Sequence, residues 1–72
     1  MFTEITVYDD FTTQCTDGED NTVAHKLALA LAQDDNQFQS EEDIYVLRVY
    51  DSQYIFEFFP GESVVSVCSG TM

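Results

Sequence analysis

Three short strands joined by two tight turns are expected in residues 43–68, which read DIYVLRVYDSQYIFEFFPGESVVSVC. Residues 44–50 and 54–59 are rich in β-branched and aromatic side chains, which favour strands. Residues 51–53 (DSQ) have the side chains that are typical of turns. The segment is therefore predicted to form an antiparallel meander.

A two-residue loop at Ser52 and Gln53 would set the register of the first hairpin. It would place Arg48 directly opposite Glu57, and this ion pair would serve as a structural contact between the two strands. The same register gathers a largely aromatic set on one face, namely Tyr45, Leu47, Val49, Tyr54, Phe56 and Phe58. A slip by one residue would scatter this set, so the alternation favours the register.

Pro60 and Gly61 are predicted to form a type II turn. Proline presets φ at the first central position of such a turn, and glycine accepts a positive φ at the second. The strand expected after this turn, residues 63–67, would add Val65 and Val67 to the aromatic face. That face is therefore the predicted core side of the meander.

The opposite face of the meander is mixed in character. It carries the Arg48–Glu57 pair together with exposed apolar candidates, and it is too apolar for an ordinary solvent surface. Large apolar side chains at a surface are typical anchors of protein–protein contacts. The candidates for the apolar part of a partner-binding site are Tyr50, Ile55 and Phe59.

Residues 2–15 are predicted to form one long strand with a bend or bulge at residues 9 and 10. A two-residue hairpin at that point is disfavoured, because it would place Ile5 opposite Gln14. A helix is predicted from about residue 22 to residue 33, with Asn21 or Thr22 as its cap. Its buried stripe is expected at Val23, Leu27 and Leu31.

The expected fold class is α+β, in the order β-α-β-β-β, with a small antiparallel sheet and one helix packed on one face. Residues 1–72 are expected to form a single compact acidic domain. His25 is predicted to be a surface residue, because no acidic or cysteine partner stands at catalytic spacing from it. No catalytic constellation, phosphate loop, metal site or cofactor site is predicted, and an enzyme is not expected.

The charge of the chain restricts the plausible partners. Fourteen acidic residues stand against two basic ones, which gives a net charge of -12. Such self-repulsion destabilises a compact state, so a basic partner is the natural inference. Direct binding of nucleic acid is not expected, because contacts to phosphates need Lys and Arg. The alternative is that the acidity serves solubility alone.

A cytoplasmic location is expected, because the sequence shows neither a membrane span nor a signal peptide. Cys15 and Cys68 lack the spacing of a redox motif or of a zinc site. In a reducing cytosol they are expected to be free thiols, although a disulfide between them remains open.

The acids cluster in predicted loops and at the ends of predicted elements. Candidate carboxylates for binding a partner are Asp17, Glu19 and Asp20 in one loop, and Asp34, Asp35, Glu41, Glu42 and Asp43 in another. Carboxylates held on a rigid rim can imitate a row of phosphates. They would then occupy the basic cleft of a protein that binds nucleic acid.

This combination resembles the small inhibitors of host defence that phages and mobile elements encode, including anti-CRISPR proteins and other DNA mimics. The likeness covers the whole chain and rests on its acidity, on the runs TDGED (16–20) and DDNQFQSEED (34–43), and on the compact meander. It implies a steric, non-enzymatic inhibitor in the bacterial host cytoplasm that binds the basic surface of a nuclease or CRISPR effector.

The competing interpretation is an acidic interaction module without nucleic-acid mimicry. It would be an immunity-like or antitoxin-like partner, or a homodimer formed through Tyr50, Ile55 and Phe59. The dependence of binding on salt concentration distinguishes the two interpretations. Mimicry of phosphates weakens as salt rises, whereas an apolar homodimer holds or tightens.

Overall fold

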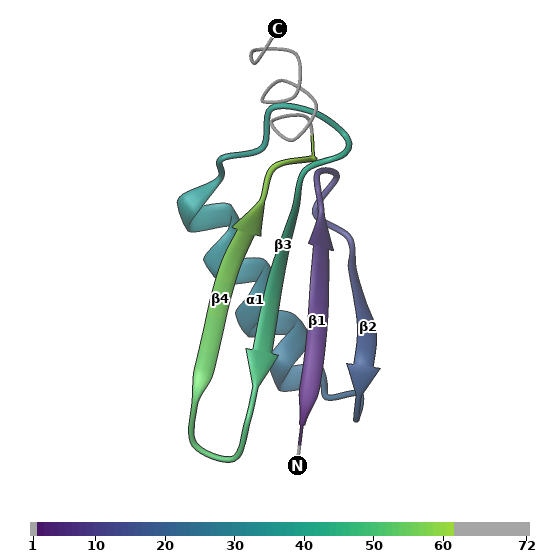
Figure 1. Cartoon of the computed structure of the whole chain (residues 1–72), viewed down its shortest axis with the longest axis vertical. Helices are drawn as coiled ribbons and strands as arrows, with labels where there is room; N and C mark the ends of the chain where they lie inside the picture. Colours follow the sequence, from purple (N-terminus) through teal and green to yellow (C-terminus); the bar gives the residue numbers. More distant parts are fainter. Residues whose placement is uncertain (1, 62–72) are drawn as a thin grey trace, which may run out of the picture.

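The computed structural model describes residues 2–61, in which four strands form one sheet and a single helix packs on it. The elements are β1 (Thr3–Tyr8), β2 (Thr13–Gly18), α1 (Thr22–Asp35), β3 (Ile44–Val49) and β4 (Tyr54–Phe59). The strands are antiparallel in the order β2-β1-β3-β4, and α1 crosses one face of the sheet (Figure 1). The predicted α+β class, with one helix on a small antiparallel sheet, is confirmed.

Residues 2–15 form a hairpin, so the prediction of one long strand is wrong. β1 and β2 pair antiparallel, with Ile5 opposite Cys15 and Val7 opposite Thr13. A loop with an odd number of residues pairs positions of the same parity, whereas a two-residue loop would pair positions of opposite parity. The alternation along the segment is therefore the same in a hairpin of this kind as in one extended strand.

A three-residue loop closes this hairpin. The N–H of Tyr8 donates to the carbonyl of Thr12 at 2.9 Å, and the N–H of Phe11 donates to the carbonyl of Tyr8 at 2.8 Å. Phe11 has a φ of 62°, the left-handed residue that such loops require at their end. This conformation strains a phenylalanine, and the edge-on contact of its ring with Phe38 at 5.5 Å offsets the strain.

The β3–β4 hairpin turns one residue earlier than predicted, at residues 51–52, which shifts the register by two. Arg48 therefore lies opposite Ile55 rather than Glu57. Because side chains alternate with a period of two, the shift leaves every side chain on its predicted face. Arg48 still reaches Glu57 diagonally, with Nη1 at 2.6 Å from Oε1, so the predicted structural pair is confirmed.

Pro60 and Gly61 do not form the predicted type II turn. Of the glycines that the structure describes, Gly18 alone has a positive φ, of 78°. Gly61 is needed for close packing instead, because a Cβ there would lie 2.5 Å from the carbonyl oxygen of Glu42. The strand predicted at 63–67 lies outside the described residues.

The core lies between α1 and the two central strands. Its fully buried large side chains are Ile5, Val7, Tyr45 and Leu47. The helix contributes Ala24, Ala28 and Ala32, so the predicted stripe is displaced, and Val23 is 70% exposed. Alanines let the helix approach the sheet closely, and partly buried leucines pack beside them. The predicted cap is confirmed, because the Asn21 side chain accepts from the N–H groups of Val23 and Ala24.

Candidate functional site: an acidic rim

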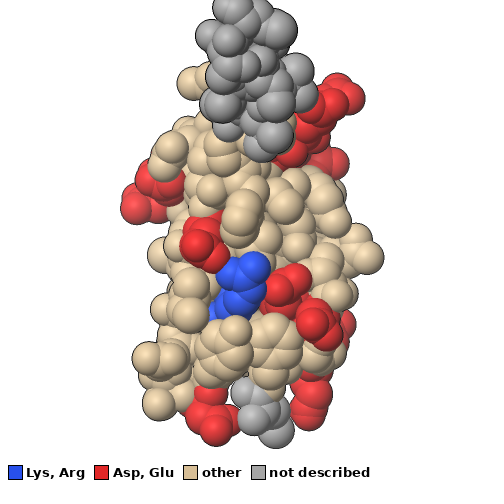
Figure 2. All heavy atoms as spheres, in the orientation of Figure 1, with Lys and Arg blue, Asp and Glu red and all other residues tan. Residues whose placement is uncertain are grey.

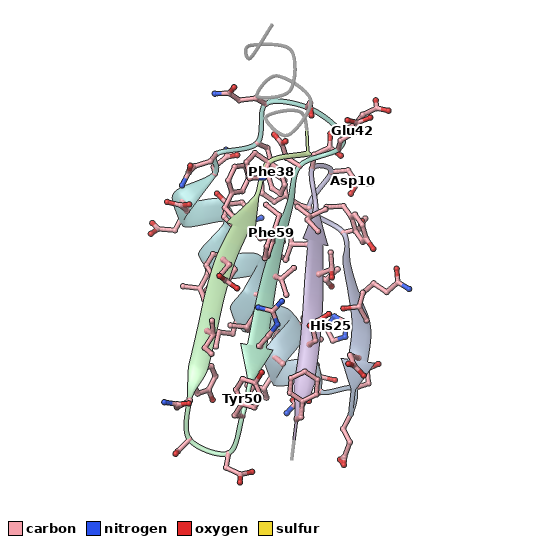
Figure 3. The ribbon with its side chains drawn as sticks, viewed as in Figure 1. Asp10, His25, Phe38, Glu42, Tyr50 and Phe59 are labelled. Atoms are coloured by element: carbon pink, nitrogen blue, oxygen red, sulfur yellow. The ribbon has the colours of Figure 1, made fainter. Side chains whose placement is uncertain are left out.

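Two acidic loops lie at the same end of the sheet. The β1–β2 loop follows Tyr8 and the α1–β3 loop precedes Ile44, and these two residues pair with each other at the strand ends. The ring contact between Phe11 and Phe38 joins the loops directly. Figure 3 shows Asp10 and Glu42 at this end, on neighbouring loops.

We call the exposed carboxylates at this end the acidic rim. They come from the two loops and from the last turn of α1, and they are Asp9, Asp10, Asp34, Asp35, Glu41 and Glu42. Neither basic residue of the chain belongs to this end, because Lys26 lies in the first half of α1 and Arg48 lies within β3. Figure 2 shows acids toward both ends of the molecule and basic atoms near the middle of this face.

The predicted acidic set is split between the two ends of the fold. Asp34, Asp35, Glu41 and Glu42 belong to the acidic rim. Asp17, Glu19 and Asp20 are also exposed, but they lie where β2 ends and α1 begins, at the opposite end (Figure 1). Asp9 and Asp10 were not among the predicted binding residues. Two adjacent aspartates between alternating stretches are a turn signal that could have placed them in a loop.

Asp10 is held in place by its own loop. Its carboxylate accepts hydrogen bonds from the Thr12 hydroxyl at 2.6 Å and from the Thr12 backbone N–H at 3.0 Å. These bonds, that of the hydroxyl first, lower the pKa of Asp10. The carboxylate is therefore charged and fixed before any partner arrives.

Asp35 is held against the core in a similar way. Its carboxylate accepts from the Tyr45 hydroxyl at 2.8 Å and from the Gln37 side-chain amide at 2.6 Å. The Tyr45 oxygen in turn accepts from the backbone N–H of Gln37 at 2.7 Å. Burial, above all, raises the pKa of Tyr45. The end of α1 is thereby fixed to the sheet.

Asp43 does not belong to the exposed set, which corrects its predicted role in partner binding. It is 3% exposed. Its carboxylate accepts from the backbone N–H groups of Gln39 at 2.7 Å, Ser40 at 3.0 Å and Gly61 at 3.0 Å. Asp43 therefore shapes the loop that presents residues 41–42, and it ties that loop to the end of β4.

The hydrogen bonds of Asp43 predict a loss of stability in acid. The N–H of Gln39, first among these bonds, lowers the pKa of Asp43 below its ordinary value. A lowered folded-state pKa contributes stability above the unfolded-state pKa of about 4, and this contribution is lost as pH falls through the folded-state value. Asp43→Asn is expected to lower the free energy of unfolding at neutral pH and to flatten its decline in acid.

Urea unfolding of wild type and variant between neutral pH and about pH 3 checks this expectation, since carboxylates titrate in that range. Asp34→Asn is the matched control, because this exposed residue makes none of the described hydrogen bonds and should leave the curve unchanged. Parallel curves for wild type and Asp43→Asn would contradict the role assigned to Asp43.

His25 has an acidic partner, so the prediction that it lacks one is wrong. Its Nε2 lies 2.6 Å from Asp20 Oδ1, and its Nδ1 lies 2.8 Å from the Thr13 hydroxyl. Both ring nitrogens are thus engaged, and the half-buried ring joins the first turn of α1 to β2. Figure 3 places His25 away from the acidic rim, near the opposite end of the helix.

The apolar candidates lie on the sheet face that α1 leaves open. Tyr50 is 38% exposed, and Ile55 and Phe59 are each 40% exposed. Glu57 faces the same side between Ile55 and Phe59, so the three do not form one continuous apolar patch. Phe59 lies toward the acidic rim and Tyr50 toward the opposite end (Figure 3).

Arg48 occupies the middle of this open face with two carboxylates. Its Nη1 lies 2.6 Å from Glu57, and its Nε lies 3.1 Å from Glu4. The Glu57 hydrogen bond is the largest cause that raises the pKa of Arg48. These two carboxylates are therefore compensated within the chain, in contrast to those of the acidic rim.

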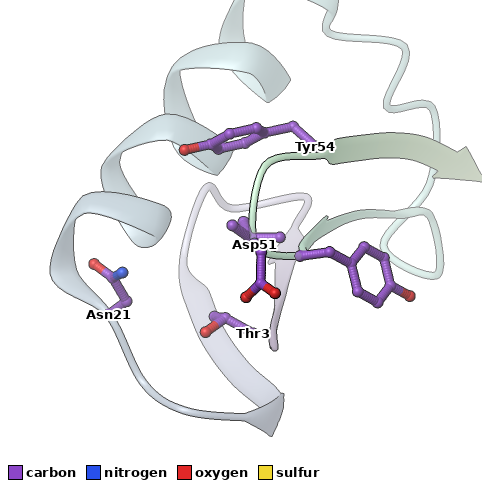
Figure 4. A pocket seen from close by; sticks show the side chains of 6 residues that line it. Thr3, Asn21, Asp51 and Tyr54 are labelled. Atoms are coloured by element: carbon purple, nitrogen blue, oxygen red, sulfur yellow. The ribbon is translucent and has the colours of Figure 1, made fainter. Parts of the chain in front are cut away.

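A shallow hollow of about 270 Å³ opens at the end opposite the acidic rim (Figure 4). Its lining residues are Thr3, Asn21, Val49, Tyr50, Asp51 and Tyr54. The Asn21 side chain already caps α1, and the Asp51 carboxylate makes the hollow unsuited to an anion. No Lys or Arg of the described residues lines the hollow, so it lacks the positive charge that favours a phosphate or a carboxylate.

The described residues offer no metal centre and no membrane span. Among residues 2–61, no three His, Cys, Asp or Glu side chains gather in a way that could hold a metal ion. Their helix, α1, is too short to cross a membrane. Cys15 is a half-buried free thiol, and Cys68 lies outside the described part of the chain.

Comparison with protein-family models, with curated proteins and with solved structures finds no match for this chain. Function is therefore inferred from the surfaces described above.

Proposed function

We propose that this chain is a non-enzymatic inhibitor of host defence that binds the basic, nucleic-acid-binding surface of a nuclease or CRISPR effector. The acidic rim would occupy the path of the nucleic acid and block its access sterically, in the cytoplasm of a bacterial host. The observation that carries this proposal is a group of exposed carboxylates at one end of the fold, which neither basic residue of the chain joins.

Preorganisation supports the rim as a binding surface. Asp10 and Asp35 accept hydrogen bonds from their own surroundings, and Asp43 holds the loop that carries residues 41–42. Carboxylates that are already positioned lose little conformational entropy on binding. Asp10 and Asp35 can therefore present their charges to a basic cleft from fixed positions.

The uncompensated negative charge of the chain also supports the acidic rim as a binding surface. The net charge of -12 attracts a basic partner over long range and speeds the encounter. Phe59 lies near the rim and is 40% exposed, so it is suited to supply an apolar contact that prolongs the complex. Tyr50 lies at the far end and would contribute to a contact there.

A defence assay with purified components tests the proposal. A panel of purified CRISPR effectors and restriction nucleases is mixed with target DNA in the presence and absence of the chain, and DNA binding and cleavage are measured. Inhibition of at least one member, relieved by adding the DNA in excess, is the expected result. Inhibition that excess DNA does not relieve, or no inhibition in the panel, would contradict steric competition through the rim.

A further inference from the structure

β4 forms one edge of the sheet (Figure 1), and the hydrogen bonds of the β3–β4 ladder determine which of its backbone groups point outward. Tyr50 and Gln53 exchange backbone hydrogen bonds of 2.8 and 3.4 Å, which makes them a hydrogen-bonded pair. Such pairs alternate along an antiparallel ladder, so the hydrogen-bonded positions of β4 are Ile55, Glu57 and Phe59.

The remaining positions of β4 direct their N–H and C=O groups away from β3. These positions are Tyr54, Phe56 and Phe58. No other strand pairs with this edge within residues 2–61. A row of outward backbone groups of this kind fits another extended strand.

The inner side chains of β4 are incompletely covered. The helix approaches β1, β2 and β3 more closely than it approaches β4. Tyr54 is 60% exposed, although it shares the core face with the half-buried Phe56 and Phe58. An occupant of the edge would thus cover aromatic surface as well as satisfy backbone groups.

The β4 edge also carries little charge, although the chain is very acidic. Residues 54–60 read YIFEFFP, and their one acid, Glu57, is bound by Arg48 at 2.6 Å. The other edge, β2, ends among the exposed acids Asp17 and Glu19. The β4 edge therefore suits an apolar strand with little charge, which is what β4 itself is.

Gly61, the last residue that the structure describes, is held against the α1–β3 loop. The Gly61 N–H donates to Asp43 at 3.0 Å, and Gly61 packs against Glu42. The turn that would bring the next residues straight back along β4 is not formed, because Gly61 lacks the positive φ it requires. A second molecule is the better candidate for the edge.

We propose that β4 pairs with β4 of a second copy, antiparallel, about a two-fold axis through Phe56. An axis there lets all three positions with outward backbone groups pair across the interface, because Phe56 is the central one. The pairing places Phe56 opposite its counterpart and Tyr54 opposite Phe58 of the second copy, which forms aromatic cross-strand pairs and covers Tyr54. The two sheets become one continuous antiparallel sheet.

The dimer and the proposed inhibition use different surfaces. The acidic rim lies at the ends of the strands, whereas the pairing runs along the side of β4. Both copies are strongly acidic, so salt weakens their repulsion and tightens the dimer. A complex with a basic partner responds to salt in the opposite direction.

Amide hydrogen exchange along β4, followed by NMR on the full chain, tests the pairing. The amides of Tyr54, Phe56 and Phe58 are expected to exchange more slowly as protein concentration rises about tenfold, and more so at higher salt. The amides of Ile55, Glu57 and Phe59, which bond to β3, are expected to be protected from exchange at every protein and salt concentration. Fast exchange of the outward amides at every concentration overturns the proposal. Slow exchange that does not depend on concentration also overturns it, because the same chain then covers its own edge.

Two substitutions at Tyr54 provide a matched pair for sedimentation experiments. Tyr54→Pro removes an outward N–H but no bond to β3, and proline is tolerated at the first residue of a strand. Tyr54→Phe keeps both the ring and the N–H. With circular dichroism unchanged, Tyr54→Pro is expected to sediment as a monomer where wild type and Tyr54→Phe associate. Equal association of the two variants overturns the proposal.

Discussion

Replacing Tyr45 by alanine is expected to leave most of the chain unfolded at room temperature. Tyr45 is 1% exposed, and its ring contacts Phe38, Phe56 and Phe58 at centroid distances of 5.0, 5.0 and 4.8 Å. Truncation of a buried aromatic side chain costs about 3–5 kcal/mol. A domain of this size has a total stability of the same order, about 0.05–0.15 kcal/mol per residue.

Tyr45→Phe separates packing from hydrogen bonding. It keeps the ring and removes the oxygen that links Asp35 to the backbone N–H of Gln37. We expect this variant to fold, with a free energy of unfolding about 1–3 kcal/mol lower than that of wild type, because the Asp35 carboxylate and the Gln37 N–H lose their partner. Urea unfolding, monitored by far-UV circular dichroism, measures the free energy of unfolding of both variants.

The matched control for Tyr45 is Tyr54→Ala. Tyr54 is the same residue type on the same face of the sheet, but it is 60% exposed. Its truncation should change the stability of the monomer by less than about 1 kcal/mol. Similar losses for Tyr45→Ala and Tyr54→Ala would show that the core does not centre on Tyr45.

Reversing two charges of the acidic rim is expected to abolish inhibition. In Glu41→Lys combined with Glu42→Lys, two repulsive contacts replace two attractive ones in the basic cleft. Affinity for the inhibited effector should fall by about 100-fold or more. The fold should persist, because both side chains are exposed and the loop is held by Asp43. Isothermal titration calorimetry measures the affinity, and circular dichroism confirms the fold.

A second double variant separates the position of the charges from their number. Asp17→Lys combined with Glu19→Lys changes the net charge equally, but at the opposite end of the fold. It should reduce the affinity only modestly, through the weaker long-range field. Equal losses for the two double variants would mean that total charge, rather than the rim, governs binding. Unchanged affinity in both would remove the mimicry of nucleic acid.

The faces of the sheet could be predicted from sequence because alternation survives changes of loop. A shift of two residues between β3 and β4 keeps Tyr45 and Leu47 inside, and an odd loop between β1 and β2 keeps Ile5 inside. The loops themselves could not be predicted, because one of them depends on Phe11 in a left-handed conformation. The contacts that offset its strain, with Phe38 and with the core, come from residues distant in the sequence.

The helix face was predicted less well, for a related reason. The leucines were expected at the centre of the buried stripe, yet Ala28 and Ala32 lie there at 0% exposure and Leu27 and Leu31 flank them. Whether alanines or leucines occupy the centre of the buried stripe depends on how closely α1 approaches the sheet. That approach is a tertiary property, and hydrophobic periodicity alone does not contain it.

The acidic loops could be recognised from composition, but which of their acids are buried and which are exposed could not. Asp43 follows Glu41 and Glu42 directly in sequence, and only the structure shows its carboxylate turned inward to the N–H groups of Gln39 and Gly61. The bond to Gly61 spans two loops far apart in sequence. No local pattern therefore distinguishes the structural aspartate from its exposed neighbours.

The salt dependence of binding decides whether the acidic rim is the binding surface. Affinity for an inhibited effector would be measured by calorimetry from about 50 to about 500 mM salt, a range over which the Debye length falls from about 14 to about 4 Å. We predict a steep fall for the wild type and a shallower one for Glu41→Lys combined with Glu42→Lys. An affinity that holds or rises with salt would contradict binding through the rim.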